Sequence, residues 1–378
     1  MDASHFDALR QHLGEHIIGQ HHLINSLLIG LLSDGHILVE GMPGLAKTKA
    51  IKSLAGALEG QFHRIQFTPD LLPADLIGTD IYQHERGEFE FRAGPLFHNV
   101  LLADEINRAP PKVQSALLEA MAERQITVGQ HTYQLPELFM VLATQNPVEH
   151  EGTYTLPEAQ LDRFLLYVRV DYPSREEELG IIELTEKELA AAQLSRPSDS
   201  DQALDFKVTP SNVLPVHEVG EASKPVLLET SSIEDKLQLS DVEQKTPLFK
   251  KGGQKMAHQV SERDVLKARD AVMQVYLDPK LKEYIVDIVQ ASRYPDKFDP
   301  DLQRWQRFGA SPRASIAMAR CARALAWLQG EQYVSPEQIQ AVVPDILHHR
   351  ILLSFEAEAE GITSDDFIQR MLQVVAIP

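Results

Sequence analysis

This sequence has almost no cysteine and no long apolar run. Its single cysteine, Cys321, cannot form a disulfide within the chain, which fits a reducing compartment. No apolar stretch approaches the roughly 20 residues that a membrane-spanning helix needs. The first residues, Met1 to His5, show neither the basic nor the apolar segment of a secretory leader. We therefore expect a cytoplasmic protein without a transmembrane segment.

Basic residues are also scarce. Lys and Arg together number 36 against 55 Asp and Glu, which gives a formal net charge of −19. Binding to nucleic acid relies on a basic surface, so this balance argues against nucleic acid as a partner, although a local basic patch would be compatible with it. The length of 378 residues and the hydrophobic fraction of 43% predict a globular chain of two or three domains.

A glycine-bearing loop stands between a predicted strand and a predicted helix. The strand is the apolar run from His36 to Glu40, and the helix has apolar periodicity from Lys49 to Leu58. Between them lies the sequence Gly41-Met42-Pro43-Gly44-Leu45-Ala46-Lys47-Thr48. This is the order of a P-loop, in which glycines let backbone N–H groups turn toward a phosphate chain and the helix adds its positive end.

The positions of this loop have separate expected roles. Lys47 is expected to reach the β- and γ-phosphates of a nucleotide, and Thr48 to place its hydroxyl on Mg²⁺. Ala46 replaces the second glycine of the general motif, so its backbone must stay in a region open to other residues. On this stretch alone, a simple Gly/Pro turn is the alternative. The expected nucleotide-binding residues here are Gly41, Met42, Pro43, Gly44, Leu45, Ala46, Lys47, Thr48 and Lys49.

A second apolar strand ends in two acids. The run from Asn99 to Ala103 predicts a buried strand, and Asp104 and Glu105 follow it. In the Walker B pattern, Asp104 would hold Mg²⁺ through water and Glu105 would orient the water that attacks the γ-phosphate. A strand that runs out into a charged loop would look similar, but the P-loop upstream favours the catalytic interpretation.

Two more polar side chains lie next to predicted strands of the same sheet. The strand from Leu138 to Thr144 leads into Asn146, whose amide could hydrogen-bond the γ-phosphate or the attacking water; a plain Asn-Pro turn is the alternative. Arg163 precedes the strand from Phe164 to Val170. There it could stabilise phosphoryl charge across a subunit boundary, or be a solvated surface arginine.

The break between the predicted helices Phe6 to Leu13 and His21 to Leu32 lies just before the P-loop strand. Its backbone at Ile18 and Gly19 could meet an adenine edge, whereas a helix-to-helix connector is the simpler alternative. The segment from Thr68 to Phe97 predicts a short helix and then a hairpin, because its apolar residues alternate.

The composition changes after residue 194. Residues 195–259 are rich in Ser, Pro and charged residues, which predicts a flexible linker, with a small β-hairpin as the alternative. From Ser261 onward the pattern is helical, and Ser261 is a predicted helix N-cap. The sequence therefore predicts an ATPase-like core in residues 1–194, an insertion or linker in 195–259 and a helical lid in 260–378.

Taken in order, these motifs resemble the AAA+ ATPases, and within them the MoxR family, whose members typically carry alanine at the position of Ala46. The resemblance covers roughly residues 5–190 and 258–378. It implies an α/β fold: a P-loop AAA+ domain with a parallel sheet sandwiched by helices, a helix-2 insert, a pre-sensor hairpin in residues 126–134, and an all-α lid. The segments that carry it are Ile17–Gln20, Gly41–Thr48, Leu101–Arg108, Ala143–Pro147, Leu156–Phe164 and Gly309–Ala314.

The resemblance also implies an activity and a site. ATP, ADP and Mg²⁺ are the implied ligands, with Mg²⁺ held by Thr48 and Asp104, and ATP hydrolysis is the implied reaction. Arg163 would be the arginine finger, and Arg313 the sensor-2 arginine that reaches back to the nucleotide. The implied catalytic residues are Lys47, Glu105, Asn146, Arg163 and Arg313.

The implied assembly is a homo-oligomeric ring, often hexameric, with a chaperone-like role in remodelling or activating partners. These partners would be proteins with von Willebrand factor A domains. Two alternatives stay open. One is a nucleic-acid motor, against which the acidic balance and the lack of a basic, aromatic-interleaved stretch weigh. The other is a magnesium-chelatase-type subunit, which shares the same motifs.

Overall fold

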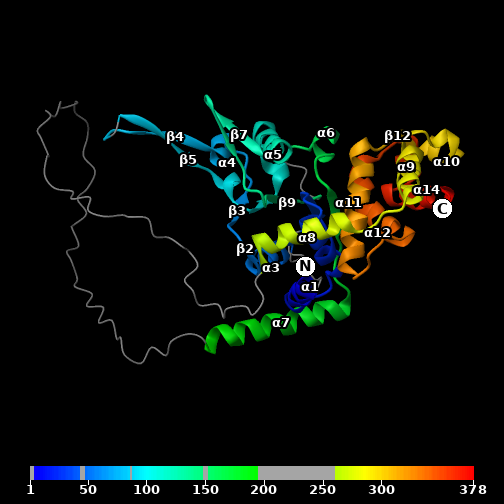
Figure 1. Cartoon of the computed structure of the whole chain (residues 1–378), viewed down its shortest axis with the longest axis horizontal. Helices are drawn as coiled ribbons and strands as arrows, with labels where there is room; N and C mark the ends of the chain where they lie inside the picture. The colour runs from blue at the N-terminus through cyan, green and yellow to red at the C-terminus, as the bar shows by residue number, and fades with distance from the viewer. Residues whose placement is uncertain (1–3, 43–46, 86, 148–151, 195–259) are drawn as a thin grey trace, which may run out of the picture. The chain divides into compact units, whose positions relative to one another are not determined.

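In the computed structural model, contacts divide the chain into two units, one of Met1–Glu186 with Met256–Pro378 and one of Lys187–Lys255. The predicted linker, residues 195–259, lies outside the described residues. Among the residues that are described, no helix has the length and apolar character needed to cross a membrane. The structure, drawn in Figure 1, describes residues 4–42, 47–85, 87–147, 152–194 and 260–378.

A five-stranded sheet forms the centre of the first unit, in the order β10-β1-β9-β6-β3. Every neighbouring pair in it is parallel. The strands predicted from apolar runs are confirmed, and their ends differ from the predicted ends by at most two residues. Because the strands are parallel, their carboxyl ends all lie at one edge of the sheet. Their bounds are β1 (Ile37–Gly41), β3 (Phe62–Gln66), β6 (Val100–Asp104), β9 (Met140–Gln145) and β10 (Leu166–Val170).

Alternate strand residues enter two separate apolar cores, as the two-residue period of a strand requires. Leu102 and Leu142 belong to a core shared with α1, α2, α3 and the lid helices. Their neighbours Leu101 and Val141 belong to a core shared with α5. Helices therefore cover both faces of the sheet, as the predicted fold requires. Their bounds are α1 (Ser4–His16), α2 (His21–Leu32), α3 (Lys47–Ala57) and α5 (Pro111–Glu123).

Two antiparallel hairpins accompany the sheet, at the positions predicted for the helix-2 insert and the pre-sensor hairpin (Figure 1). They meet through aromatic side chains: the rings of Phe91 and Tyr133 stack with centroids 4.2 Å apart and an interplanar angle of 17°. The short helix predicted before the first hairpin is also present. These elements are α4 (Pro73–Ile77), β4 (Gly78–Gln83), β5 (Glu88–Ala93), β7 (Gln125–Val128) and β8 (His131–Gln134).

The C-terminal part is a helical lid, as predicted. The hydroxyl of Ser261 accepts from the backbone N–H of Asp264 at 3.1 Å, so the predicted N-cap is confirmed. The lid also contains two short helices and a short β ladder that show too few residues for a sequence period. Its elements are α8 (Glu262–Gln274), α9 (Pro279–Arg293), α10 (Pro300–Trp305), β12 (Gln306–Phe308), α11 (Pro312–Leu328), α12 (Pro336–Leu347), β13 (Leu352–Leu353), α13 (Phe355–Ala359) and α14 (Ser364–Val374).

A short helix precedes β10, where α6 spans Glu158–Leu161. The four residues between α6 and β10 form a connection that the lid contacts. Arg350 of the lid donates from Nε to the carboxylate of Asp162 at 2.8 Å and from Nη2 to the carbonyl of Phe164 at 2.6 Å. Its side chain is only 3% exposed, and that of Asp162 is 16% exposed. A buried charged network therefore joins the lid to the core.

We predict that Arg350→Ala lowers the free energy of unfolding by about 3–5 kcal/mol, because it removes a buried donor from the carboxylate of Asp162 and from several carbonyls. Arg304→Ala is the matched control. Arg304 pairs with Glu360 at 3.0 Å, but its side chain is 43% exposed, so we expect a loss below about 1 kcal/mol. Urea denaturation measures both. Equal losses in the two variants would contradict the importance of the buried network.

Candidate active site

The carboxyl edge of the sheet brings the main predicted residues together. β1 ends at Gly41, and α3 begins with Lys47 and Thr48. The intervening Pro43–Ala46 lie outside the described residues. β6 ends at Asp104, and β9 ends one residue before Asn146. Since β9 lies between β1 and β6, these three strand ends are consecutive along the edge.

Lys47 lies over the ends of β1 and β9. Its Nζ donates to the carbonyl of Gly41 and lies 3.4 Å from the carbonyl of Gln145. Burial lowers the pKa of Lys47, and the charges of Asp104, Glu105 and Glu40 oppose this shift. The ammonium group and the Walker B acids therefore act on one another within a single site.

Asp104 is held by two side chains. Its Oδ1 accepts from the Thr144 hydroxyl at 2.6 Å, and its Oδ2 accepts from Arg64 Nη2 at 2.5 Å. The same Thr144 oxygen accepts from the backbone N–H of Glu105 at 2.9 Å. A single hydroxyl therefore positions both acids. Sequence reasoning treated Thr144 only as the end of a strand, and it did not single out Arg64.

Glu105 has an unusual backbone conformation. Its φ of 58° and ψ of 52° lie in the left-handed region, which costs a non-glycine residue on the order of 1–3 kcal/mol. Such strain persists only where surrounding contacts enforce it, and it is common at active sites. The Glu105 carboxylate accepts from Gln66 Nε2 at 2.6 Å and pairs with Arg108 Nε at 3.1 Å. Two side chains therefore hold the carboxylate of Glu105, and the Thr144 hydroxyl holds its backbone N–H.

Gln66 and Arg64 could have been found from the sequence by one signal. Arg64 and Gln66 are polar and stand on either side of the apolar Ile65 in one strand. Because side chains alternate along a strand, these two share one face. The register pairs Gln66 directly with Asp104. What the sequence lacked was the neighbour relation between β3 and β6.

Asn146 is 7% exposed, so the predicted sensor amide is buried at the strand tip. Its backbone carbonyl accepts from Asn107 Nδ2 at 3.5 Å. The preceding Gln145 donates to Glu40 and, at 3.2 Å, to the hydroxyl of Tyr167. Side chains from four elements thus fix the strand end that carries Asn146.

The two predicted arginines lie together, away from this group. Arg163 donates from Nη1 to the carbonyl of Leu118 in α5 at 2.6 Å. Arg313 donates from Nη1 to the carboxylate of Asp162 at 3.2 Å. Both arginines line one cavity of about 330 Å³, which is lined by neither Lys47 nor the two Walker B acids. The structure therefore divides the predicted site residues into two groups.

The predicted adenine segment follows α1 and is covered by α7 (Arg175–Leu194). Gly19 has a φ of +78°, and a Cβ added there would lie 2.6 Å from Cδ of Glu177. Ile18 approaches Gly180 so closely that a Cβ on that glycine would lie 3.2 Å from Ile18 Cδ1. The positive backbone angle therefore favours glycine at position 19.

Comparison with known proteins defines the class. Residues 36–166 match the ATPase family associated with various cellular activities (AAA), and residues 303–371 match the AAA lid domain. With the parallel sheet, the loop before Lys47 and the paired acids, these matches define a P-loop ATPase of the AAA class with its lid.

Individual relatives identify the family within this class of ATPases. The chain is 41% identical to "Chaperone MoxR1" of Mycobacterium tuberculosis, over 96% of this chain and 79% of that protein. It is 39% identical to "Uncharacterized protein YeaC" of Bacillus subtilis, over 97% of this chain and 93% of that one. A crystal structure of a predicted ATPase from Cytophaga hutchinsonii is 39% identical, with a TM-score of 0.76 over 100% of this chain and 96% of that one. The chain belongs to the MoxR family of AAA+ ATPases.

We predict that Thr144→Val lowers kcat for ATP hydrolysis by about 10–100-fold, because both acids lose the hydroxyl that positions them. Thr144→Ser keeps a hydroxyl at the same place and should retain most of the activity. The measurement is the release of phosphate at saturating Mg·ATP, together with a thermal melt to show that each variant is folded. Unchanged turnover by a folded Thr144→Val protein would mean that the shared hydroxyl does not position the acids.

Proposed function

We propose that this protein hydrolyses ATP to ADP and phosphate, with Mg²⁺, and uses the reaction to remodel or activate partner proteins. The observation that carries the proposal is the pair of acids, Asp104 and Glu105, fixed by one hydroxyl beside Lys47. A partly buried lysine next to two oriented carboxylates is the arrangement that phosphoryl transfer to water needs.

Each residue would have one task in this reaction. Lys47 would bind the β- and γ-phosphates, and the loop from Gly41 to Ala46 would offer its backbone N–H groups to them. Thr48 and Asp104 supply the hard oxygen donors that Mg²⁺ prefers, so the donor set fits this ion. When bound, the ion neutralises the charge on the phosphate oxygens.

The water would be activated on the other side of the γ-phosphate. Glu105 would orient it and take up its proton, with its carboxylate held by Gln66 and Arg108. The amide of Asn146 would hydrogen-bond the γ-phosphate or this water. The strained backbone of Glu105 fits such a role, since it holds the carboxylate in one orientation before substrate arrives.

We infer that Arg163 completes the site of a neighbouring subunit, in a homo-oligomeric ring that is often hexameric in this family. The support is that Arg163 and Arg313 line one cavity that the chain's own Lys47 and Walker B acids do not line. Arg313 would then act beside Arg163, because Asp162, the residue next to Arg163, binds Arg313. Two arginines presented together would stabilise the charge on the transferred phosphoryl group.

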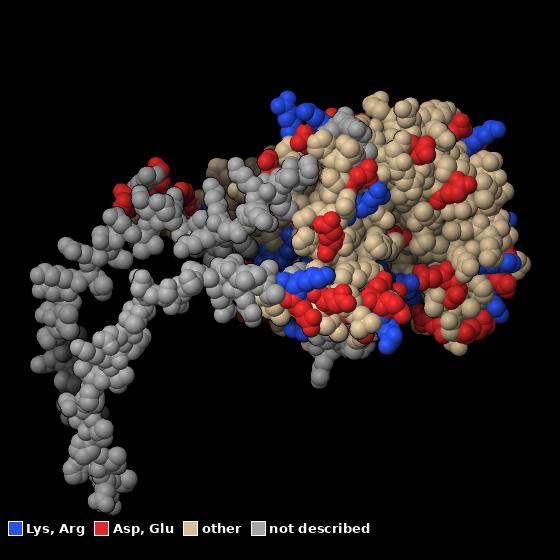
Figure 2. All heavy atoms as spheres, turned by 90° about the horizontal axis from the view of Figure 1, so that it is seen from below, with Lys and Arg blue, Asp and Glu red and all other residues tan. Residues whose placement is uncertain are grey.

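The partners we propose are proteins with von Willebrand factor A domains, and we propose that this protein binds them in the cytoplasm. The support is the family relationship, within which one relative is named a chaperone. The first hairpin offers a surface for such a partner, since the cross-strand pair Tyr82 and Phe89 is 44% and 72% exposed. On the face shown in Figure 2, Asp and Glu form larger clusters than Lys and Arg, which supports a protein partner over nucleic acid.

The test of the proposed reaction compares two variants. Lys47→Ala should lose ATP binding, because Lys47 contacts phosphate before any reaction. Glu105→Gln should bind ATP normally and hydrolyse it at least about 100-fold more slowly, because only the activation of water is lost. Fluorescent-nucleotide binding and phosphate release measure the two properties.

The matched control for Lys47→Ala is Lys52→Ala. Lys52 lies in the same helix, but its side chain is exposed, so this variant should bind and hydrolyse ATP as the wild type does. Wild-type turnover by Glu105→Gln would refute the assignment of Glu105.

A mixing experiment tests the role of Arg163. Arg163→Ala alone should bind ATP and lose on the order of 10³-fold or more in rate. Mixed with Glu105→Gln, it should partly recover, because the first variant supplies Lys47 and Glu105 while the second supplies Arg163 to the same interface.

The control is a mixture of Lys47→Ala with Glu105→Gln. Both of these defects lie in the same half of the site, so no interface in that mixture becomes complete. If the mixture with Arg163→Ala co-assembles and recovers no more activity than this control, Arg163 does not act on a neighbouring subunit.

A further inference from the structure

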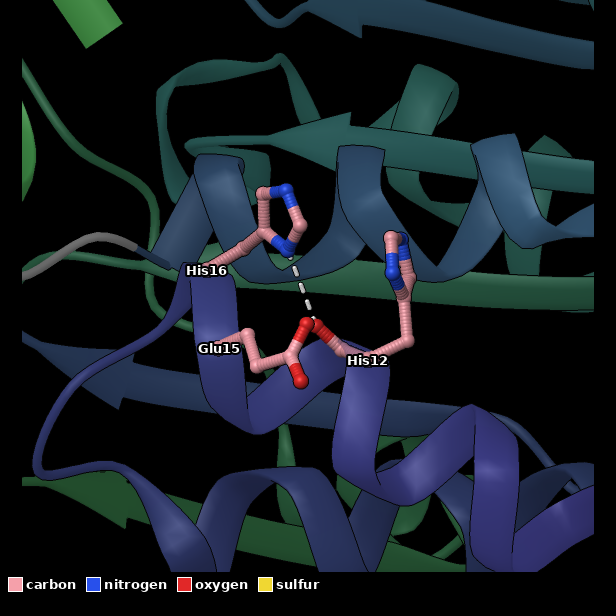
Figure 3. Close-up of side chains that lie close together, drawn as sticks. All are labelled: His12, Glu15 and His16. Atoms are coloured by element: carbon pink, nitrogen blue, oxygen red, sulfur yellow. Dashed lines mark hydrogen bonds between the residues drawn. The ribbon is translucent and has the colours of Figure 1, made fainter. Parts of the chain in front are cut away.

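The last turns of α1 carry a cluster of metal-ligating side chains outside the nucleotide site. His12, Glu15 and His16 occupy positions i, i+3 and i+4, which are neighbours on a helix surface. One imidazole nitrogen or carboxylate oxygen from each lies within 4.8 Å of the other two. Figure 3 shows the three side chains gathered at the end of the helix. In the part of the chain that the structure describes, no other group of three histidine, cysteine or acidic residues has this spacing.

The helix that bears the cluster is firmly anchored. Its opposite face places Phe6, Leu9 and Leu13 in the core, where each is at most 2% exposed. The ring of Phe6 packs edge-on against Trp327 of the lid, with centroids 5.4 Å apart. Packing of this face therefore holds the helix in place without any ion, which lowers the cost of ordering the site.

The orientation of His16 suits a ligand. Its Nδ1 lies 2.9 Å from the backbone carbonyl of His12. A carbonyl can only accept, so Nδ1 carries the hydrogen and Nε2 keeps its lone pair. Metal-binding histidines commonly donate their second ring nitrogen to a carbonyl in this way. The two rings are 4.5 Å apart, and all three side chains are partly or fully exposed, so an ion can reach them from solvent.

We propose that His12, Glu15 and His16 bind one divalent transition-metal ion, of which Zn²⁺ is the representative. Two imidazoles and one carboxylate suit such ions, whereas Mg²⁺ and Ca²⁺ prefer oxygen ligands alone. This site is therefore chemically distinct from the one proposed for Mg²⁺ beside Lys47. Water would complete a tetrahedral set at this open surface.

The cluster needs only a small adjustment to close on an ion. Zinc bonds of about 2.1 Å place tetrahedral ligand atoms roughly 3.4 Å apart, whereas the three atoms here lie within 4.8 Å of one another. Side-chain rotations of these partly exposed residues can supply the difference. The spacing H-x-x-E-H also occurs in zinc enzymes, where the glutamate acts on water. Here the Glu15 oxygen lies within the ligand group itself, so we assign it as a ligand.

A bound ion would join the final two turns of α1. This helix ends at His16, and the connection that includes Ile18 and Gly19 follows directly. Because the ion would bridge His12 and His16, it would resist fraying of the helix end and slow amide hydrogen exchange there. The effect does not depend on nucleotide.

The test is calorimetric titration of the full chain with Zn²⁺ in the absence of nucleotide. The wild type should bind one ion that His16→Gln binds on the order of tenfold more weakly or worse. His63→Gln is the matched control: the rings of His63 and His98 are 4.9 Å apart, but no third ligand among the described residues completes a group there. That variant should bind Zn²⁺ as the wild type does, which separates the proposed site from weak binding to the other histidines.

Two further measurements guard against loss of structure. Glu15 is exposed, so Glu15→Gln should remain folded, as measured by circular dichroism. This folded variant should nevertheless bind Zn²⁺ more weakly than the wild type does. Co²⁺ bound to the wild type should show the visible absorption of a tetrahedral site, and His16→Gln should lose it. Equal Zn²⁺ affinity in the wild type, Glu15→Gln and His16→Gln, or no binding by the wild type, would overturn the proposal.

Discussion

The parallel pairing of the five strands is the constraint on which the candidate site depends. Parallel strands all end at one edge, so residues that are 41 to 146 positions along the chain come to lie side by side there. Antiparallel pairing of β6 would carry Asp104 to the opposite edge, far from Lys47. The alternation of apolar residues into two cores stabilises this pairing from both faces, because a slip of one residue would move every strand side chain into the core on the opposite face.

Asp162 connects the parts that a nucleotide cycle would move. It accepts from Ser311 and Arg313 at the start of α11 and from Arg350 after α12, and it precedes Arg163 in the chain. Ser311 also accepts from the backbone of Arg313, so the hydroxyl that caps α11 binds the core as well. One carboxylate of the core thereby binds the lid at Ser311, Arg313 and Arg350.

Much of the fold could be predicted from the sequence, because strands, hairpins and long helices leave a local signature of period and turn residues. The Ser261 cap and the Walker B strand are examples. The positioning of the acids could not be predicted in the same way. The role of Thr144 depends on which strand lies beside β6. The left-handed backbone of Glu105 depends on contacts with three other side chains. The burial of Arg350 depends on how the lid packs. Each of these is decided by tertiary contacts, which no short stretch of sequence records.

The stack of Phe91 on Tyr133 has a mechanical consequence. The stack joins two hairpins that belong to separate two-stranded sheets, so that the hairpins contact each other through these side chains. The second hairpin is hydrogen-bonded at its base to the end of α5, where the N–H of Leu135 donates to Arg124 at 3.0 Å. The chain reaches α5 only a few residues after Glu105. A tilt of α5 would therefore be passed through the stacked rings to the first hairpin, which carries the exposed pair Tyr82 and Phe89.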